Sequence, residues 1–140
     1  DCPVANAMAP QLNRIYDEAQ EEGVRCYLVY PREGTTAAIM QEHAEGYGLS
    51  GIGIADTDHV LVEALDARIT PEAYLLEFTG QNDWAIRYRG RVNDLYASIG
   101  NRRDEPSQHD FYEAIIALES GESVGTQQTQ AIGCTIQRRH

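Results

Sequence analysis

The sequence predicts an α/β domain in which a mixed sheet is flanked by helices. Apolar residues such as Met8, Leu12 and Ile15 recur at helical spacing near the start of the chain. A near-continuous apolar run at residues 24–30 is typical of a strand buried on both faces, as in parallel sheets. Residues 73–90 read as an antiparallel hairpin. Helices that alternate with buried strands imply right-handed crossovers within one sheet, with the hairpin at one side of it.

Length and composition limit the class of protein. A chain of 140 residues is long enough for one domain with a real core, and we expect residues 1–121 to form it and residues 122–140 to be a tail that carries Cys134. The formal net charge of -11 makes nucleic acid and anionic membrane surfaces poor partners. No apolar run approaches the length of a membrane span, so no membrane insertion is expected. The three cysteines lack zinc-finger spacing, and neither a metal nor a cofactor is expected.

Cys2 lies at or just before the first turn of the predicted first helix. Pro3 suits the first helical position, because its missing N–H is not needed there. Unpaired backbone N–H groups and the positive end of the helix dipole favour a thiolate at Cys2, and the thiolate is the nucleophilic form of cysteine. The alternative is a small, buried, apolar cysteine. Because a helix entrance is rarely deep core, we favour the reactive interpretation.

A second helix is predicted to extend to Tyr47, with Thr35 or Thr36 as its cap. His43 lies on this helix, and no other His or Cys is three or four residues away from it. We therefore interpret His43 as a partly buried surface histidine rather than a metal ligand. A short strand at residues 49–55 follows.

The acidic turn at residues 56–58 is predicted to cap a third helix at residues 59–65. A cation site is the weaker interpretation, because no calcium-loop spacing follows the turn. His59, at the start of this helix, is expected to be exposed. Cys26 lies inside the apolar run at residues 24–30 and is expected to be a core residue.

The predicted hairpin consists of strands at residues 73–78 and 84–90. Pro71 precedes it and has no N–H to donate to a ladder, so it marks either a first strand residue or an unusual peptide bond. A polar connection at residues 93–106 then leads to an amphipathic helix at residues 108–120.

Four segments of the chain resemble the redoxin branch of the thioredoxin fold, the branch of alkyl hydroperoxide reductase and thiol-specific antioxidant proteins. They are Asp1-Cys2-Pro3 followed by Pro10, Thr70-Pro71-Glu72-Ala73-Tyr74-Leu75-Leu76, Tyr88-Arg89-Gly90-Arg91-Val92-Asn93-Asp94-Leu95-Tyr96 and Ala131-Ile132-Gly133-Cys134-Thr135-Ile136. The resemblance covers nearly the whole chain. It is strongest to a subgroup of bacterial redoxin-like domains, often parts of larger exported proteins, and so implies a periplasmic or secreted location.

The sequence departs from this family pattern at two places. Ala5 stands where a thioredoxin has its second active-site cysteine, so exchange between two cysteines of one loop is impossible here. In this fold a central strand leads into the active-site helix, and such a strand would precede Asp1. We expect the natural gene to supply it, because its removal would leave two unpaired sheet edges.

The resemblance implies that Cys2 is the catalytic cysteine and that Pro71 forms a cis peptide bond against its sulfur. A Cys2 thiolate can attack a hydroperoxide to give a sulfenic acid, or a protein disulfide to give a mixed disulfide. Cys134 is the candidate second thiol, with a structural thiol or a partner for the strand cysteine as alternatives. Arg91 alternates with Arg89 and is the candidate cation near the sulfur, with an exposed charge pair as the alternative.

The leading hypothesis is a thiol-based oxidoreductase, either a peroxiredoxin-like peroxidase with antioxidant activity or a thiol-disulfide oxidoreductase. Its substrate would be a peroxide or a protein disulfide, an unidentified thiol would reduce it, and a homodimer is a further option for its assembly. A second hypothesis is a copper-binding redoxin relative that uses Cys2, Cys134 and a histidine such as His140 or His59. The copper chaperones of this fold have two cysteines in the active-site loop, whereas this sequence has one. A third hypothesis is a non-catalytic interaction module of a larger exported protein.

Overall fold

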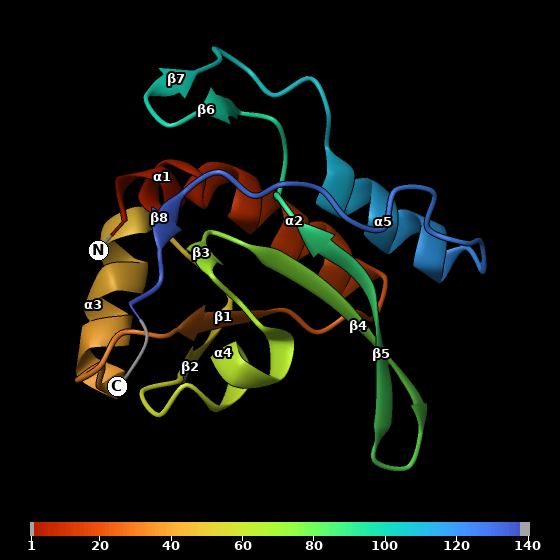
Figure 1. Cartoon of the computed structure of the whole chain (residues 1–140), viewed down its shortest axis with the longest axis horizontal. Helices are drawn as coiled ribbons and strands as arrows, with labels where there is room; N and C mark the ends of the chain where they lie inside the picture. Colours follow the sequence, from red (N-terminus) through yellow and green to blue (C-terminus); the bar gives the residue numbers. More distant parts are fainter. Residues whose placement is uncertain (1, 138–140) are drawn as a thin grey trace. The chain divides into compact units, whose positions relative to one another are not determined.

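A computed structural model describes residues 2–137 of the chain and shows a mixed α/β protein (Figure 1). Within these residues there are five α-helices and eight β-strands, and the strands form four two-stranded pairs. The chain divides into two compact units. The first extends to Thr70 and includes the segment from Cys134 onward, and the second is Pro71–Gly133. The expected domain at residues 1–121 with a tail at residues 122–140 stays a prediction.

The first unit combines helices with a parallel and an antiparallel strand pair. Its elements are α1 (Pro3–Ala7), α2 (Ala9–Glu21), β1 (Tyr27–Tyr30), α3 (Ala37–Tyr47), β2 (Ile52–Ala55), α4 (Val60–Leu65), β3 (Ile69–Thr70) and β8 (Cys134–Thr135). β1 and β2 run parallel, with Tyr27 opposite Ile52. α3 packs against β2, and Gly53 leaves the space there that the Met40 side chain occupies.

The last strand within residues 2–137, β8, lies beside β3, as Figure 1 shows in blue and green. The two strands form an antiparallel ladder in which Ile69 faces Thr135 and Thr70 faces Cys134. Beyond the ladder, the Ile136 N–H donates to the carbonyl oxygen of Arg68 at 2.8 Å, and Ile136 is buried. A short apolar segment from the end of the chain therefore completes the first unit.

The second unit is built on a long hairpin. Its elements are β4 (Ala73–Gly80), β5 (Asp83–Gly90), β6 (Tyr96–Ser98), β7 (Asn101–Arg102) and α5 (Asp110–Glu119). α5 packs against β4 and β5. Tyr88 is fully buried on β5, and its hydroxyl donates to the Arg91 carbonyl oxygen at 2.6 Å and bonds to Thr129 Oγ1 at 2.6 Å. The hydroxyl of this core tyrosine is thereby satisfied, as a buried polar group requires.

Asp94 organises the connection between the hairpin and α5. Its buried carboxylate accepts hydrogen bonds from Ser107 N at 2.6 Å, Ser107 Oγ at 2.5 Å and Gln108 N at 2.9 Å, and Arg103 Nε lies 3.7 Å away. Burial by itself raises the pKa of Asp94, but these bonds and the Arg103 charge outweigh it and bring the pKa down to about 2. Asp94 thus ties the two ends of this connection together.

Several sequence predictions are confirmed in detail. Thr36 caps α3 by accepting from Ile39 N at 3.2 Å, and α3 ends at Tyr47. The acidic turn caps α4, because Asp56 accepts from the N–H groups of Leu61 and Val62. The hairpin and the helix after it are also present, close to the expected bounds.

The first helix is interrupted, contrary to expectation. α1 ends at Ala7, α2 begins at Ala9, and Met8 N bonds back to Ala5 O at 3.1 Å in a tighter turn. Pro10 explains the interruption, because a proline has no N–H for the helical bond and its ring clashes with the preceding turn. The helical spacing of the apolar residues continues across the break, which is why the sequence pattern does not reveal it.

The prediction of a fully buried strand at residues 24–30 is wrong. β1 contains only Tyr27–Tyr30, and its residues alternate between exposed and half-buried, with Tyr27 47% exposed. Tyr27 and Val29 share one face of β1, and the rest of the described chain leaves this face exposed. Cys26 lies outside the strand and is only half-buried, so its assignment to the core is also wrong.

The expected exposure of His59 is also wrong, and one small hairpin was not predicted. His59 was expected at the surface, but it is 2% exposed and its ring Nε2 lies 2.6 Å from the Pro31 carbonyl oxygen. The polar connection at residues 93–106 contains the small hairpin of β6 and β7, which has no apolar alternation to reveal it.

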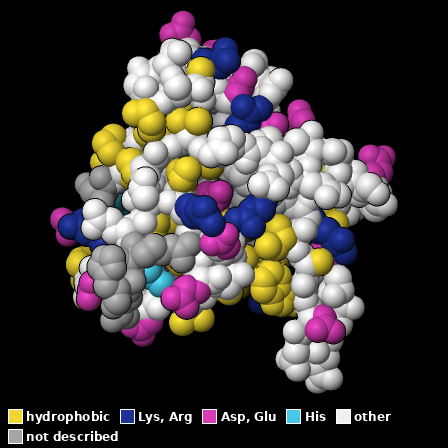
Figure 2. Space-filling model, viewed as in Figure 1, with side chains coloured by type: hydrophobic (Ala, Val, Ile, Leu, Met, Phe, Trp, Pro, Cys, Tyr) yellow, Lys and Arg dark blue, Asp and Glu magenta, His cyan; other side chains and the backbone are white. Residues whose placement is uncertain are grey.

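Large apolar side chains also reach the surface. Figure 2 shows hydrophobic side chains among acidic and basic ones on the face in view. The exposed ones include Ile52 on β2 and, in the second unit, Phe78 and Trp84, which lie opposite each other in the hairpin. None of the helices described is long and apolar enough to cross a membrane.

Candidate functional site

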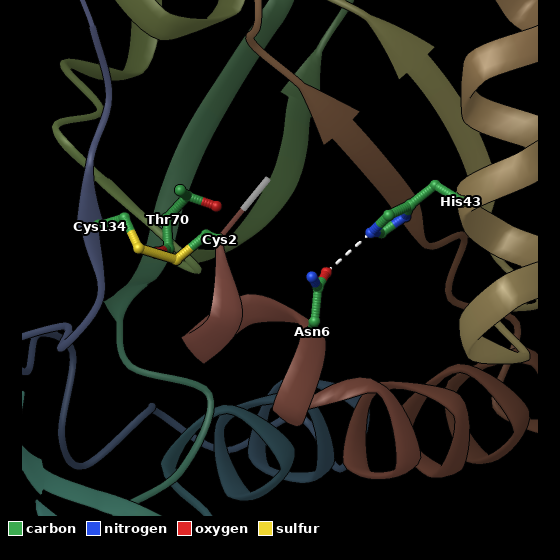
Figure 3. Close-up of a disulfide and its surroundings, with 5 residues drawn as sticks. All are labelled: Cys2, Asn6, His43, Thr70 and Cys134. Atoms are coloured by element: carbon green, nitrogen blue, oxygen red, sulfur yellow. Dashed lines mark hydrogen bonds between the residues drawn. A yellow bond between two sulfur atoms is a disulfide. The ribbon is translucent and has the colours of Figure 1, made fainter. Parts of the chain in front are cut away.

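Cys2 and Cys134 form a disulfide in the first unit, with their Cα atoms 6.0 Å apart (Figure 3). Cys2 is the N-cap residue of α1, and Cys134 is the first residue of β8. The bond joins positions 132 residues apart in the sequence. The structure therefore brings together the two cysteines that sequence analysis named as the nucleophile and the candidate second thiol.

Cys2 is set into the protein surface rather than projecting from it. As predicted, Cys2 precedes the first helical turn, and Pro3 is the first helical residue. The expectation that this position stays out of the core is wrong, because Cys2 is only 8% exposed. Its Sγ lies 3.4 Å from the carbonyl oxygen of Thr70 on β3. Cys134 is half-buried, so the disulfide is more open to solvent on the β8 side than on the α1 side.

Cys26 is the free cysteine of the chain. Burial raises the pKa of its thiol, because a desolvated thiolate is costly. At neutral pH Cys26 is therefore a weaker nucleophile than an unperturbed cysteine. It serves as the internal reference for any experiment on Cys2 and Cys134.

Pro71 and Arg91, the other two predicted site residues, belong to the second unit. Pro71 directly follows Thr70 in the chain, and its place against the sulfur stays a prediction. Arg91 lies one residue beyond β5, where its Nε donates to Asp110 Oδ2 at 2.6 Å and its Nη2 donates to Gln108 Oε1 at 2.6 Å. The hydrogen bond to Asp110 raises the pKa of Arg91. This cation is therefore already paired within its own unit.

Arg89 also has a local partner. Its guanidinium carbon lies 5.2 Å from the centre of the Tyr74 ring, across the β4–β5 ladder, in a cation–π contact. The strand alternation correctly places Arg89 on the hairpin, whereas Arg91 lies outside the strand.

His43 makes contacts that the sequence did not reveal. As expected, it is half-buried on α3, but its ring nitrogens bond to Asn6 on α1 and to Tyr30 on β1. Figure 3 shows the bond between Asn6 and His43, with Asn6 on the same short helix as Cys2. The sequence gives no signal for this cluster because its three members come from elements far apart in the chain.

Among residues 2–137, no group of three or more His, Cys, Asp or Glu side chains is arranged to hold a metal ion. Cys2 and Cys134, two proposed copper ligands, are joined to each other. His59 contacts the Pro31 carbonyl oxygen, and His140 lies outside the described residues. No observation on the described residues therefore favours the copper hypothesis.

Comparison with known proteins identifies structural relatives. No protein-family model and no curated protein matches the chain. The crystal structure of an uncharacterized conserved protein from Geobacillus kaustophilus has a TM-score of 0.82 at 23% sequence identity, covering 99% of this chain and 72% of that chain. A hypothetical protein from Sinorhizobium meliloti has a TM-score of 0.81 at 21% identity, covering 97% and 73%. The likeness shows a shared fold.

Proposed function

We propose that the chain is a thiol-based oxidoreductase with a thioredoxin-like fold of the redoxin type, in which Cys2 is the nucleophile and Cys134 is the resolving thiol. The observation that carries the proposal is the Cys2–Cys134 disulfide. Half-buried Cys26 remains free, so the pairing is selective. The redoxin assignment itself rests on the four sequence segments described above.

The proposed reaction uses the two cysteines, a hydroperoxide as the oxidant and a dithiol as the reductant. The Cys2 thiolate attacks the terminal oxygen of a hydroperoxide, the O–O bond breaks, and after uptake of a proton the products are a sulfenic acid and an alcohol or water. The Cys134 thiol then attacks the sulfenic sulfur, which forms the disulfide and releases water. A reducing dithiol returns two electrons and two protons to the protein and itself becomes a disulfide. With a protein disulfide as substrate, Cys2 forms a mixed disulfide instead, and Cys134 releases the substrate as a dithiol.

The location of the two sulfurs supports this order of events. Half-buried Cys134 is the less buried of the two cysteines, which favours attack of an incoming reductant thiol at Cys134, so that Cys2 leaves as the thiolate. The proposed exported location in a bacterium rests on the resemblance alone, because a disulfide that cycles in catalysis also occurs in reducing compartments. Arg91 has no part in this proposal, because its guanidinium is bound to Asp110 and Gln108.

The deciding experiment is mass spectrometry of the reduced protein after one equivalent of hydrogen peroxide. We expect the Cys2–Cys134 crosslink in the wild-type chain and, in Cys134→Ser, a Cys2 sulfenic acid that is trapped by dimedone. Cys26→Ser is the matched control and should behave as wild type.

Two outcomes would count against the proposal. If Cys26 reacts with peroxide faster than Cys2, the assignment of the nucleophile is wrong. If the crosslink resists thiol reductants and the reduced protein consumes neither peroxide nor a model disulfide, the bond is structural. The non-catalytic interaction module would then be the better description.

A further inference from the structure

Three elements of the first unit meet at His43. Its Nε2 lies 2.8 Å from Asn6 Oδ1 on α1, and its Nδ1 lies 3.0 Å from the Tyr30 hydroxyl on β1. The Tyr30 and His43 rings pack edge to face with centres 5.4 Å apart. The Tyr47 ring also contacts His43, with the two ring centres 4.9 Å apart. His43 is thus held in one orientation by two hydrogen bonds and two aromatic neighbours.

The hydrogen-bond partners define the form of the ring. Asn6 Oδ1 can only accept, so His43 Nε2 carries a hydrogen, and Nδ1 is then free to accept from the Tyr30 hydroxyl in the neutral ring. Burial lowers the pKa of His43, which favours the same neutral form. At neutral pH the cluster is a directed chain of bonds from Tyr30 through His43 to Asn6.

Asn6 connects this chain to the reactive cysteine. The Asn6 N–H donates to the carbonyl oxygen of Cys2 at 2.9 Å, which is the first helical bond of α1. α1 has only five residues, and a helix of this length has little stability of its own. Cys2 lies at the start of α1. The contact between His43 and Asn6 therefore attaches this part of α1 to α3 and, through Tyr30, to β1.

We propose that His43 is a positioning residue for Cys2: by holding Asn6, it keeps the Cys2 sulfur within bonding reach of Cys134 when the disulfide is reduced. The inference rests on the proposed function, because it concerns the redox couple of those two cysteines. In the disulfide form the covalent bond itself holds α1. In the dithiol form the anchor through His43 takes over this task and keeps the two thiols close.

Loss of the contact between His43 and Asn6 should shift the equilibrium between disulfide and dithiol in one direction. Without the anchor, the reduced form gains conformational freedom while the disulfide form gains less, so the equilibrium moves toward the dithiol. The equilibrium to measure is protein disulfide plus dithiothreitol dithiol giving protein dithiol plus cyclic oxidised dithiothreitol, in which two electrons and two protons are transferred. Its constant is read by alkylation of the thiols and mass spectrometry, which requires no turnover of any substrate.

Two substitutions at His43 separate positioning from general packing. The amide of His43→Gln reaches the place of Nε2 and can still donate to Asn6, whereas the amide of His43→Asn reaches only the place of Nδ1. We expect His43→Asn to move the equilibrium toward the dithiol by up to about fivefold, since the shift is at most the whole contribution of one hydrogen bond, and His43→Gln to stay near wild type. His109→Asn in the second unit is the matched control and should have no effect.

A double-mutant cycle distinguishes loss of the bond between His43 and Asn6 from a general loss of stability. Asn6→Ala should shift the equilibrium as His43→Asn does, and the double variant should show no further shift, because both remove the same bond. Equal constants for wild type, His43→Asn and His43→Gln would overturn the inference, as would additive effects of the two single variants. Either result would leave the proposed function standing, because that function is tested separately by the reaction of Cys2 with peroxide.

Discussion

Cys134 faces Thr70 across the ladder of β8 and β3, and the Sγ of Cys2 lies 3.4 Å from the carbonyl oxygen of the same Thr70. One residue of β3 therefore adjoins both ends of the disulfide. The backbone pairing positions Cys134, and the start of α1 positions Cys2. This relationship links the beginning, the middle and the end of the described chain at one point.

The disulfide should contribute strongly to the stability of the folded chain. It closes a loop between residues 132 positions apart. In the chain-entropy model, a cross-link across so long a loop lowers the entropy of the unfolded state and raises its free energy by up to about 5 kcal/mol. We expect Cys134→Ser to lower the free energy of unfolding in urea by several kcal/mol and to make it insensitive to dithiothreitol. Cys26→Ser is the control, and dithiothreitol should lower its stability as it lowers that of the wild type. If dithiothreitol leaves the urea midpoint of wild-type unfolding unchanged, the prediction is wrong.

Asp94 should make the stability depend on pH in the acid range. Its pKa is lowered from 3.8 in a model peptide to about 2 in the folded protein, so the unfolded state binds more protons between these values. The stabilisation is fully present above pH 3.8 and is lost as the pH falls toward about 2. In Asp94→Asn, the fall in unfolding free energy across this window should become smaller. Asp104→Asn, an exposed residue of the same connection, is the control and should keep the wild-type slope.

The Asp94→Asn variant should also be less stable at neutral pH, by about 1–3 kcal/mol, because an amide nitrogen replaces an oxygen that accepts a hydrogen bond. Thermal unfolding at neutral pH measures this loss. A variant as stable as wild type would show that the bonds from Ser107 and Gln108 contribute nothing net.

Gly90 should not tolerate a side chain. Its φ of +141° lies in a region that residues with a Cβ rarely adopt, and a Cβ there would overlap Thr129 Oγ1 and its carbonyl oxygen and lie 2.8 Å from its backbone N. We expect Gly90→Ala to cost about 3 kcal/mol or more in unfolding free energy. Gly46→Ala is the contrasting variant, since Gly46 lies inside α3 with open space around it, and it should stabilise by about 0.5–1 kcal/mol. Equal effects of the two substitutions would refute the prediction.

Local signals in the sequence predicted the elements whose causes are local. The cap at Thr36, the cap at Asp56 and the apolar alternation of the hairpin each act within a few residues of the element they define. The break at Met8 and the exposure of β1 were missed, because the first is hidden within a continuous helical pattern and the second depends on which elements cover the strand. The buried His59 was missed for the same reason, since its partner, the Pro31 carbonyl oxygen, is distant in sequence.

By itself, the sequence determined the order of the main helices and strands, the acidic character of the chain and the position of Cys2 before a helical turn. Only the tertiary structure decided which of the other two cysteines Cys2 meets, that Arg91 is paired with Asp110, and that Asn6 and His43 touch. The physical reason is the range of the interactions. Helix caps and hydrophobic periodicity act between near neighbours in the chain, whereas a disulfide or a hydrogen bond between elements depends on where folding brings distant residues.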